Sequence, residues 1–481
     1  MQDKKKRTVQ RSLFFLLLML QILVGIFFAQ KKQGYHEDEM YTYYSTNGTN
    51  GLFLPDREWQ KSAEILKEFV VLPGENFDYA EVQSWDVHPP LYYFIFHSVC
   101  DFFPGRFSKW PGIFTNLIAM VLCFLLMERL LRTLGQPFSV RFLILALIGV
   151  NPMTISALVF FRMYFWLTVF VLACANLHVG MTLRLMEGGT EFSKESFFRF
   201  LLPLMIVSYL GFLTQYFYLI FFVLIGVAFS LVLSKKRGPR ALLLYVCCCA
   251  ASLLLAVLSY PASAAHIFRG YRGKEAAQSA VSGENLWGRL SFFTGLLNDF
   301  VFGGGLFVLL VICLFLAVWM ALGKRLFLPP EPEDTKGRRR GLFAAYGVLL
   351  FGTLGYFLVV AKVALLAYAP SNRYEMPVYP LLLALAILLL YRLLKKFLQE
   401  DGKTAVVLCT LFFLVLTGKG LCVDHRVLFL YPENAARLAY ARQHREDAAI
   451  LFMNPEVSYR VWHYEDIFMN YPRLYFADTA N

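Results

Sequence analysis

Long apolar runs separated by short polar segments dominate the chain from residue 12 to residue 421. Each run is about as long as a helix that crosses a hydrocarbon core roughly 30 Å thick. The segments do not show the short alternating pattern of an outer-membrane barrel. The pattern therefore predicts an all-α polytopic membrane protein with about 11 transmembrane helices, at 12–30, 111–127, 142–160, 163–182, 200–214, 217–233, 241–260, 300–322, 341–362, 376–394 and 404–421.

Composition agrees with this pattern. Hydrophobic residues make up 58% of the 481 residues, above the roughly 45–50% of a soluble protein. The segment 200–233 carries no charge, and it is too long for one crossing. We expect two helices there, with Gln215 at the tip of a helical hairpin. The nine cysteines fall in or beside apolar runs and predict packing residues, not a disulfide framework or a zinc site.

The positive charge is concentrated in the segments that connect the predicted helices on the expected inner side. Of the 46 Lys and Arg residues, 25 lie in the segments expected inside, namely 1–11, 128–141, 184–199, 234–240, 323–340 and 391–403. Basic residues concentrate in short cytoplasmic loops. The formal charge of +12 is thereby explained without nucleic acid as a partner. We expect an uncleaved first helix with a cytoplasmic N-terminus in the cell membrane, and loops 31–110 and 261–299 and the C-terminus outside.

The acidic run "GYHEDEMYTYY" directly follows the first helix. It contains His36, Asp38 and Glu39, and tyrosines follow in place of further charge, so the run is expected to pack against protein or the membrane interface. A solvated charged face is the alternative. A carboxylate held here is a candidate general base, or a ligand for a divalent cation such as Mg²⁺ or Mn²⁺.

The stretch "SWDVHPPLYYFIF" combines Asp86 and His88 with two prolines. Proline pushes the preceding residue out of the helical region and suits the first turn of a helix. The apolar segment after Pro90 is short, and counting it as a crossing would move every later basic loop outside, so an interfacial or re-entrant outer helix is expected. Tyr92 and Tyr93 would suit the headgroup layer. A plain helix start with a capping aspartate is the alternative.

Arginines at the outer ends of spans form a third group. An arginine at membrane depth normally faces a partner or a polar cavity, and guanidinium groups suit phosphate. Snorkelling to the surface and ordinary loop arginines are the alternatives. The candidates are Arg162 in "FFRMYFW", Arg373 and Tyr374 in "YAPSNRYEMPVYP", and His266, Arg269 and Arg272 in "SYPASAAHIFRGYRGKE".

Read in order, these motifs and "LTQYFYLIFF" resemble the polytopic C-type glycosyltransferases over residues 12–395. The resemblance is to bacterial members of the family 39 group, similar to protein O-mannosyltransferases and aminoarabinose transferases. It implies transfer of one sugar, usually with inversion, from a polyprenyl-phosphate carrier. The acceptor would be a hydroxyl group on lipid, cell-wall glycan or protein at the outer face of the membrane.

The resemblance also implies roles for residues. The acidic pair falls on Asp38 and Glu39 as catalytic residues, with Asp38 as the base. Arg373 matches the family's late Arg-Tyr and would bind the carrier phosphate. The other expected substrate-binding residues are His36, Asp86, His88, Arg162, Tyr164, Gln215, Tyr216, His266, Arg269, Arg272 and Tyr374.

Two domains are expected, a transmembrane glycosyltransferase domain at 1–422 and a small extracytoplasmic α/β segment at 423–481. The segment combines one helical pattern with two strand-like runs, "AAILFMN" and "RLYFAD". Two other functions remain open from the sequence. One is a transporter or flippase of lipid-linked saccharides, and the other is an inactive member of the same fold.

Overall fold

A computed structural model describes residues 2–48, 57–74, 79–188, 194–282, 285–322 and 333–479. The chain folds as two compact units. The first, the helical unit, comprises Met1–Val24, Ala119–Ala157 and Tyr164–Leu428. The second, the mixed unit, comprises Gly25–Ile118, Leu158–Met163 and Phe429–Asn481.

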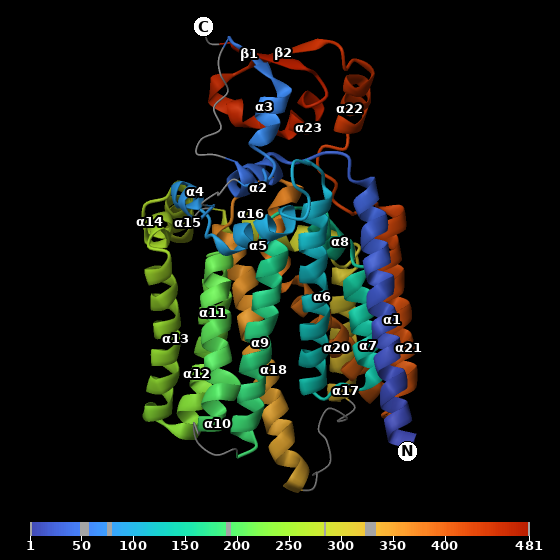
Figure 1. The fold of residues 1–481 in the computed structure, drawn as a ribbon. Coiled ribbons are helices and arrows are strands. Elements are labelled where there is room, and N and C mark those ends of the chain that lie inside the picture. The colour runs from blue at the N-terminus through green and yellow to red at the C-terminus, as the bar shows by residue number, and fades with distance from the viewer. Residues whose placement is uncertain are drawn as a thin grey trace. The chain divides into compact units, whose positions relative to one another are not determined.

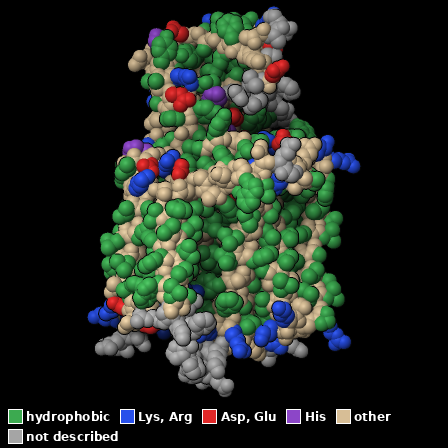
Figure 2. Space-filling view, turned by 180° about the vertical axis from the view of Figure 1, so that it is seen from behind, with side chains coloured by type: hydrophobic (Ala, Val, Ile, Leu, Met, Phe, Trp, Pro, Cys, Tyr) green, Lys and Arg blue, Asp and Glu red, His purple; other side chains and the backbone are tan. Residues whose placement is uncertain are grey.

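The helical unit consists of long apolar helices. In Figure 1, α9, α11, α12, α13 and α18 run along a common direction, and α9, α12 and α18 contact one another. Hydrophobic side chains cover much of the outer surface of the bundle, and Lys and Arg gather at its lower end in Figure 2. The helices are α1 (Gln2–Lys31) and α6 (Trp110–Thr133), which both continue into the mixed unit, and α9 (Tyr164–Met186), α11 (Leu202–Thr214), α12 (Tyr218–Arg237), α13 (Pro239–Ser259), α16 (Leu286–Phe300), α17 (Leu306–Leu322), α18 (Glu333–Val363), α20 (Tyr379–Phe397) and α21 (Gly402–Gly418).

The expected all-α polytopic architecture is confirmed. Within the described residues, 9 helices are long and apolar enough to cross a membrane, and up to 10 if one bent pair is counted as a span. The predicted span that this count leaves out is 300–322, where α17 has 17 described residues and the residues that follow it lie outside the described ranges. Most of the basic segment 323–340 lies outside the described residues.

The predicted single span at 142–160 is broken. The chain forms α7 (Phe138–Gly149) and α8 (Pro152–Leu158), with a bend of 54° between them. Pro152 has no N–H group to continue a helix. The Asn151 side chain stabilises the break, because its oxygen accepts from the Met153 N–H at 3.0 Å and its amide nitrogen donates to the Val301 carbonyl at 2.9 Å.

The hairpin expected at Gln215 is present. α11 ends at Thr214 and α12 begins at Tyr218. Gln215 has extended backbone angles, and its side-chain oxygen accepts a hydrogen bond from the Phe217 N–H. This side-chain bond satisfies a backbone donor that the turn leaves outside both helices.

The remaining helices of the helical unit are short. Two of them, α14 and α15, follow α13 and contact each other. A run of short helical turns at 369–378 leads into α20. Their bounds are α10 (Lys194–Ser196), η1 (Phe197–Leu201), α14 (Ala262–Phe268), α15 (Tyr271–Val281), η2 (Ala369–Ser371), α19 (Asn372–Glu375), η3 (Met376–Val378) and η4 (Lys419–Val423).

The mixed unit joins the first predicted outer loop to the C-terminal segment. Its sheet has the order β1-β3-β2, with β1 antiparallel to β3 and β2 parallel to β3. Its elements are α2 (Glu37–Asn47), β1 (Trp59–Lys61), α3 (Ser62–Lys67), α4 (Tyr79–Trp85), α5 (Leu91–Cys100), α22 (Asn434–Gln443), β2 (Ala448–Met453), η5 (Pro455–Tyr464), α23 (Glu465–Phe468) and β3 (Arg473–Asp478). The expected helix and two strands of the tail are present.

One strand of this sheet was not expected. β1 lies in the first loop, and its Trp59 pairs with Tyr475 of β3. The core under the sheet contains Phe468, Leu474 and Phe476, and Ile65 of the first loop packs against it. The 59-residue tail shares its core with residues distant in sequence, which is expected for a segment too short to bury a stable core alone.

Candidate functional site

The centre of the candidate site in the mixed unit is Arg162, which is only 4% exposed. Its Nη1 donates to the Asp38 carbonyl and the Thr42 hydroxyl, both at 3.1 Å, and to the Tyr93 hydroxyl at 3.2 Å. Its Nη2 lies 3.2 Å from Nε2 of His88. A planar guanidinium with several fixed donors suits this many directed contacts. Arg162 therefore connects α2, α5 and the His88 loop, and it does not snorkel to the surface.

The contacts of Arg162 define the tautomer of His88. Arginine only donates hydrogen bonds, so Nε2 of His88 accepts and the ring carries its proton on Nδ1. Nδ1 lies 2.6 Å from Oδ2 of Asp86. Asp86, His88 and Arg162 thus form a continuous hydrogen-bonded chain, which we call the Asp86–Arg162 chain. The prolines that follow His88 keep this loop out of the helix, and α5 begins only at Leu91.

The Asp86 carboxylate remains ionised in this arrangement. Burial alone would raise its pKa, but the interaction with His88 and the attraction of Arg162 lower the pKa of Asp86 to about 2. Because the pKa in the folded state lies below the usual value, this interaction stabilises the fold above the ordinary aspartate range. The stabilisation is lost only as the pH falls toward 2.

Asp38 lies in the first turn of α2 and is a partly exposed acid. Its carboxylate is 29% exposed, and its own backbone carbonyl accepts from Arg162. The positive end of the helix dipole favours an ionised carboxylate at this position. His36 caps the helix, since its Nδ1 accepts from the Asp38 N–H at 3.0 Å. The geometry gives His36 a capping role and leaves the Asp38 carboxylate partly open.

Glu39 is placed differently from Asp38. Its side chain is fully buried and pairs with Lys32 at 2.9 Å. Its other oxygen accepts from the Phe161 N–H at 3.0 Å, and the Lys32-bound oxygen also accepts from the His36 N–H at 2.8 Å. These bonds attach α2 to the segment that carries Arg162. The geometry makes Glu39 a positioning residue for Asp38 and Arg162.

Replacing Glu39 by Gln should destabilise the mixed unit, because Lys32 would then be buried beside a neutral partner. Breaking a buried pair by removing one charge costs about 3–5 kcal/mol. We expect a clearly lower thermal unfolding midpoint for the purified protein. Glu64→Gln is the control, since Glu64 pairs with Lys67 at 58% exposure. Equal midpoints for the two variants would contradict the assigned role of Glu39.

Two further residues of this cluster were not predicted. Thr42 is buried, donates to the carbonyls of Asp38 and Phe161, and accepts from Arg162. Tyr93 is fully buried, and its hydroxyl accepts from Arg162. The sequence contained one indication that Thr42 belongs to the site, because a residue four positions after Asp38 lies on the same helix face.

The helical unit holds a second cluster of predicted residues. Arg373 is 8% exposed, and its Nη2 donates to the Tyr374 hydroxyl at 3.1 Å. The Tyr374 ring makes an edge contact with the Tyr164 ring at a centroid distance of 5.5 Å, and its centroid lies 5.7 Å from that of Phe217. The backbone carbonyl of Tyr374 accepts from the Tyr356 hydroxyl. The structure therefore brings Arg373, Tyr374 and Tyr164 together.

The remaining candidates lie around the α11–α12 turn and the segment after α13. The Tyr216 hydroxyl lies 2.8 Å from Nδ1 of His266. His266 is buried and Tyr216 is half-buried. Gln215 closes the turn with its side chain. Arg272 pairs with Glu275 at 2.9 Å on the exposed helix α15, and Arg269 is exposed at the end of α14.

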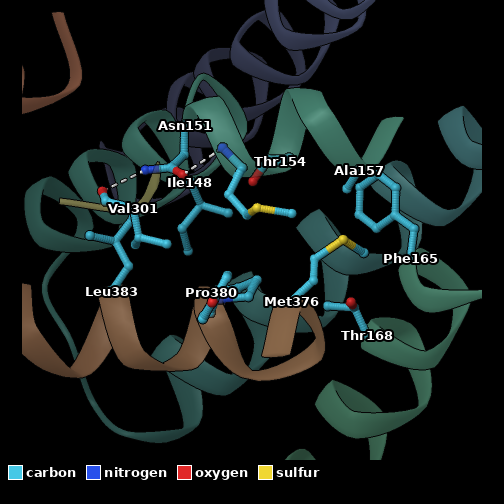
Figure 3. A pocket seen from close by; sticks show the side chains of 12 residues that line it. Ile148, Asn151, Thr154, Ala157, Phe165, Thr168, Val301, Met376, Pro380 and Leu383 are labelled. Atoms are coloured by element: carbon cyan, nitrogen blue, oxygen red, sulfur yellow. Dashed lines mark hydrogen bonds between the residues drawn. The ribbon is translucent and has the colours of Figure 1, made fainter. Parts of the chain in front are cut away.

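A narrow apolar cavity lies at the break between α7 and α8 (Figure 3). Asn151 and Thr154 line it near the break, Phe165 lines it from α9, and Met376 and Leu383 line it from η3 and α20. A second narrow hollow shares several of its wall residues. The shared residues are Ile148, Thr154, Phe165 and Pro380.

The described residues do not supply a metal site. None of their His, Cys, Asp and Glu side chains form a group of three or more placed to hold an ion. In the mixed-unit cluster, Asp86 is bound to His88, and Arg162 lies among the acids. The divalent cation expected from the sequence therefore stays a prediction, and no chemical step below uses it.

A buried carboxyl group marks the C-terminal part of the mixed unit. Glu465 is fully buried, and neither of its oxygens has a hydrogen-bond partner among the described residues. Burial, with a smaller contribution from neighbouring Asp466, raises the pKa of Glu465 to about 8. A raised pKa in the folded state means that folding favours the neutral acid.

The stability of the mixed unit should therefore fall as the pH rises from the usual glutamate range toward 8. Glu465→Gln imitates the neutral acid, so it should raise the thermal midpoint at pH 8 and change it little at pH 5. The midpoints of variant and unmodified protein at both pH values measure this. Glu446→Gln, at an exposed position, is the control. A gain that does not depend on pH would contradict the assignment.

The helical architecture has the fold of the C-type glycosyltransferase group, as its similarity to two solved structures shows. ArnT from Cupriavidus metallidurans, solved bound to undecaprenyl phosphate, superimposes with a TM-score of 0.53 at 12% identity, over 97% of this chain and 86% of that chain.

The archaeal oligosaccharyltransferase AglB from Archaeoglobus fulgidus, solved with an inhibitory peptide and a dolichol-phosphate, gives a TM-score of 0.52 at 12% identity. The match covers 97% of this chain and 64% of the AglB chain. No family model and no curated protein sequence matches the chain. At this identity, the two similarities establish the fold.

Proposed function

We propose that the protein is a glycosyltransferase that moves a single hexose or pentose from a polyprenyl-phosphate carrier to a hydroxyl acceptor, with inversion. The observation that carries this proposal is the cluster in the mixed unit, where a partly exposed Asp38 lies beside Arg162 and the Asp86–Arg162 chain. It occurs on a fold whose solved examples include proteins bound to undecaprenyl phosphate and dolichol-phosphate.

In the proposed reaction, Asp38 acts as the general base. Its carboxylate accepts the proton of the acceptor hydroxyl as that oxygen attacks the anomeric carbon of the sugar. The bond between the anomeric carbon and the phosphate oxygen breaks on the opposite face, so polyprenyl phosphate leaves and the configuration inverts. Asp38 suits this role better than Glu39, because the Asp38 side chain is 29% exposed whereas the Glu39 side chain is fully buried and paired with Lys32.

The Asp86–Arg162 chain prepares the site for this step. Asp86 fixes the proton on Nδ1 of His88, and His88 in turn orients the guanidinium of Arg162. Arg162 then holds the first turn of α2 through the Asp38 carbonyl. Groups fixed before reaction avoid reorganisation during it, which is the larger part of electrostatic catalysis.

Arg373 is the proposed ligand of the carrier phosphate in the helical unit. Its side chain is 8% exposed and donates to the Tyr374 hydroxyl, and the Tyr374 ring contacts Tyr164. Guanidinium and phosphate form strong charge-assisted hydrogen bonds. A positive charge at the phosphate also stabilises the leaving group. His266, Tyr216 and Arg272 are proposed to contribute to the same substrate's binding.

The apolar cavity in Figure 3 is the proposed site for part of the isoprenoid chain. Its walls are mainly hydrophobic, with a few polar side chains such as Thr154 and Thr168. Such a lining suits an unbranched or methyl-branched hydrocarbon. We propose that transfer takes place at the extracytoplasmic face, because the predicted inner segments are basic and the candidate acids lie in the predicted outer loop.

The proposal is tested with the purified protein in liposomes that contain radiolabelled polyprenyl-phosphate sugars and membrane-lipid, glycan and peptide acceptors. We expect label to move to a hydroxyl acceptor with release of polyprenyl phosphate. Movement of intact donor between leaflets without transfer would support the flippase, and neither activity would support an inactive member. The same assay after EDTA treatment, with Mg²⁺ or Mn²⁺ returned, tests the predicted cation.

A further inference from the structure

A polar hollow of about 990 Å³ lies in the helical unit, separate from the residues assigned above. Its walls come from the end of α6, the last turns of α9 and the π-helical turn η1. The three arginines of the hollow lie near the ends of candidate membrane spans, while Asn176 lies further inside the span of α9. Side chains at span ends reach the headgroup layer, so the hollow opens where lipid headgroups lie.

Three arginines line this hollow, Arg129 from α6, Arg184 from α9 and Arg199 from η1. Two of their guanidinium groups lie over the ring of Phe200, at 5.8 Å for Arg184 and 5.5 Å for Arg199. The Phe200 ring therefore places two guanidinium groups, each with several N–H donors, on the same wall of the hollow. Because π-helical turns are frequent at functional sites, the position of Arg199 on η1 is a second reason to expect a ligand.

Two carboxylates accompany the arginines. Glu187 lines the hollow, and Glu195 lies 3.6 Å from Arg184 and 3.8 Å from Arg199. These two separations are longer than a hydrogen bond, and the Glu195 side chain is 69% exposed. Exposed pairs of this kind contribute little. An anion can therefore take the place of Glu195 on the guanidinium groups.

Asn176 provides an independent sign of a ligand. It lines the hollow and is 7% exposed. Its amide nitrogen donates to the carbonyls of Leu126 at 2.9 Å and Leu172 at 2.8 Å. These two bonds fix the orientation of the amide, because the opposite orientation would set oxygen against oxygen. Its Oδ1 is buried without a hydrogen-bond partner among the described residues, so it calls for a donor from a ligand.

We propose that this hollow binds the headgroup of an anionic phospholipid that carries hydroxyl groups, of the phosphatidylglycerol type. The phosphodiester accepts from the guanidinium groups of Arg129, Arg184 and Arg199. A headgroup hydroxyl donates to Oδ1 of Asn176 and satisfies it. A choline headgroup has no donor for Asn176, and its positive charge faces the arginines. Basic pockets between membrane helices bind anionic headgroups by the same physics.

The test is native mass spectrometry of the full-length protein, delipidated in detergent and titrated with phosphatidylglycerol. We expect one adduct that binds at least tenfold more tightly than in the triple variant Arg129→Gln, Arg184→Gln, Arg199→Gln. A matched control removes the same charge outside the hollow, at Arg132, Lys235 and Lys236, and it should bind as the unmodified protein does. Arg199→Gln alone, at a 64% exposed side chain, should weaken binding several-fold without a change in thermal midpoint.

Three comparisons with other probes decide the ligand. Phosphatidylmethanol has the same charge without hydroxyl groups and should bind more weakly than phosphatidylglycerol, while phosphatidylcholine should bind more weakly still. Inorganic phosphate at 10-fold excess should leave the lipid adduct in place. Equal binding of phosphatidylcholine, equal binding by the triple variant, or displacement by free phosphate would overturn the proposal.

Discussion

Asp38→Asn should lower the rate of sugar transfer by about 10²- to 10⁴-fold, the usual contribution of a general base. Asparagine fills the same volume and keeps the first turn of α2, but it cannot accept the acceptor's proton. The backbone carbonyl that accepts from Arg162 is unaffected. We therefore expect the loss in kcat, with the affinity for the polyprenyl-phosphate donor and the thermal midpoint close to those of the unmodified protein.

The control for this prediction is Asp101→Asn. Asp101 lies in the same unit, follows α5 and is 53% exposed, with His97 as its neighbour at 3.6 Å. This variant should transfer sugar normally. If Asp38→Asn were as active as Asp101→Asn, Asp38 would not be the base. A loss of donor binding in Asp38→Asn, with kcat unchanged, would assign the residue to binding instead.

Arg162→Lys should lower kcat/KM by roughly 10²-fold, even though the charge is kept. The two terminal nitrogens of Arg162 reach four partners on three segments, and a single ammonium group cannot reproduce this planar arrangement. Loss of one preorganised donor typically costs about 10²- to 10³-fold in rate. His88 would also lose the donor on its Nε2.

Arg106→Lys is the matched control, because Arg106 is an exposed residue of the same unit. It should leave transfer and stability unchanged. A normal rate of transfer in Arg162→Lys would contradict the proposed role of the Asp86–Arg162 chain.

The predicted spans show what a local pattern can determine. Hydrophobic length and charge identified the positions of the helices, including the hairpin at Gln215, because both are properties of neighbouring residues. The same pattern missed the break at Asn151 and Pro152. That break depends partly on the Asn151 bond to the Val301 carbonyl, 150 positions away, which no local pattern contains.

The candidate site shows the same division. The sequence indicated the residue types, with acids after the first helix, a histidine before two prolines and arginines at the span ends. The residue pattern alone did not separate Asp38 from Glu39, and only the resemblance to the glycosyltransferases named Asp38 as the base. The tertiary structure separates them, because Lys32 and the backbone of Phe161 engage Glu39 and leave Asp38 partly exposed. The groups that a side chain contacts depend on tertiary packing, which brings together segments that are distant in sequence.

The sequence by itself determined that this chain is a helical multi-pass membrane protein, since this follows from hydrophobicity and charge, and it indicated candidate residues for chemistry. Only the tertiary structure decided that Asp86, His88 and Arg162 form one hydrogen-bonded chain and that β1 of the first loop completes the sheet of the tail. The physical reason is that such contacts gain their free energy from groups brought together on folding, after the entropy of closing long loops has been overcome.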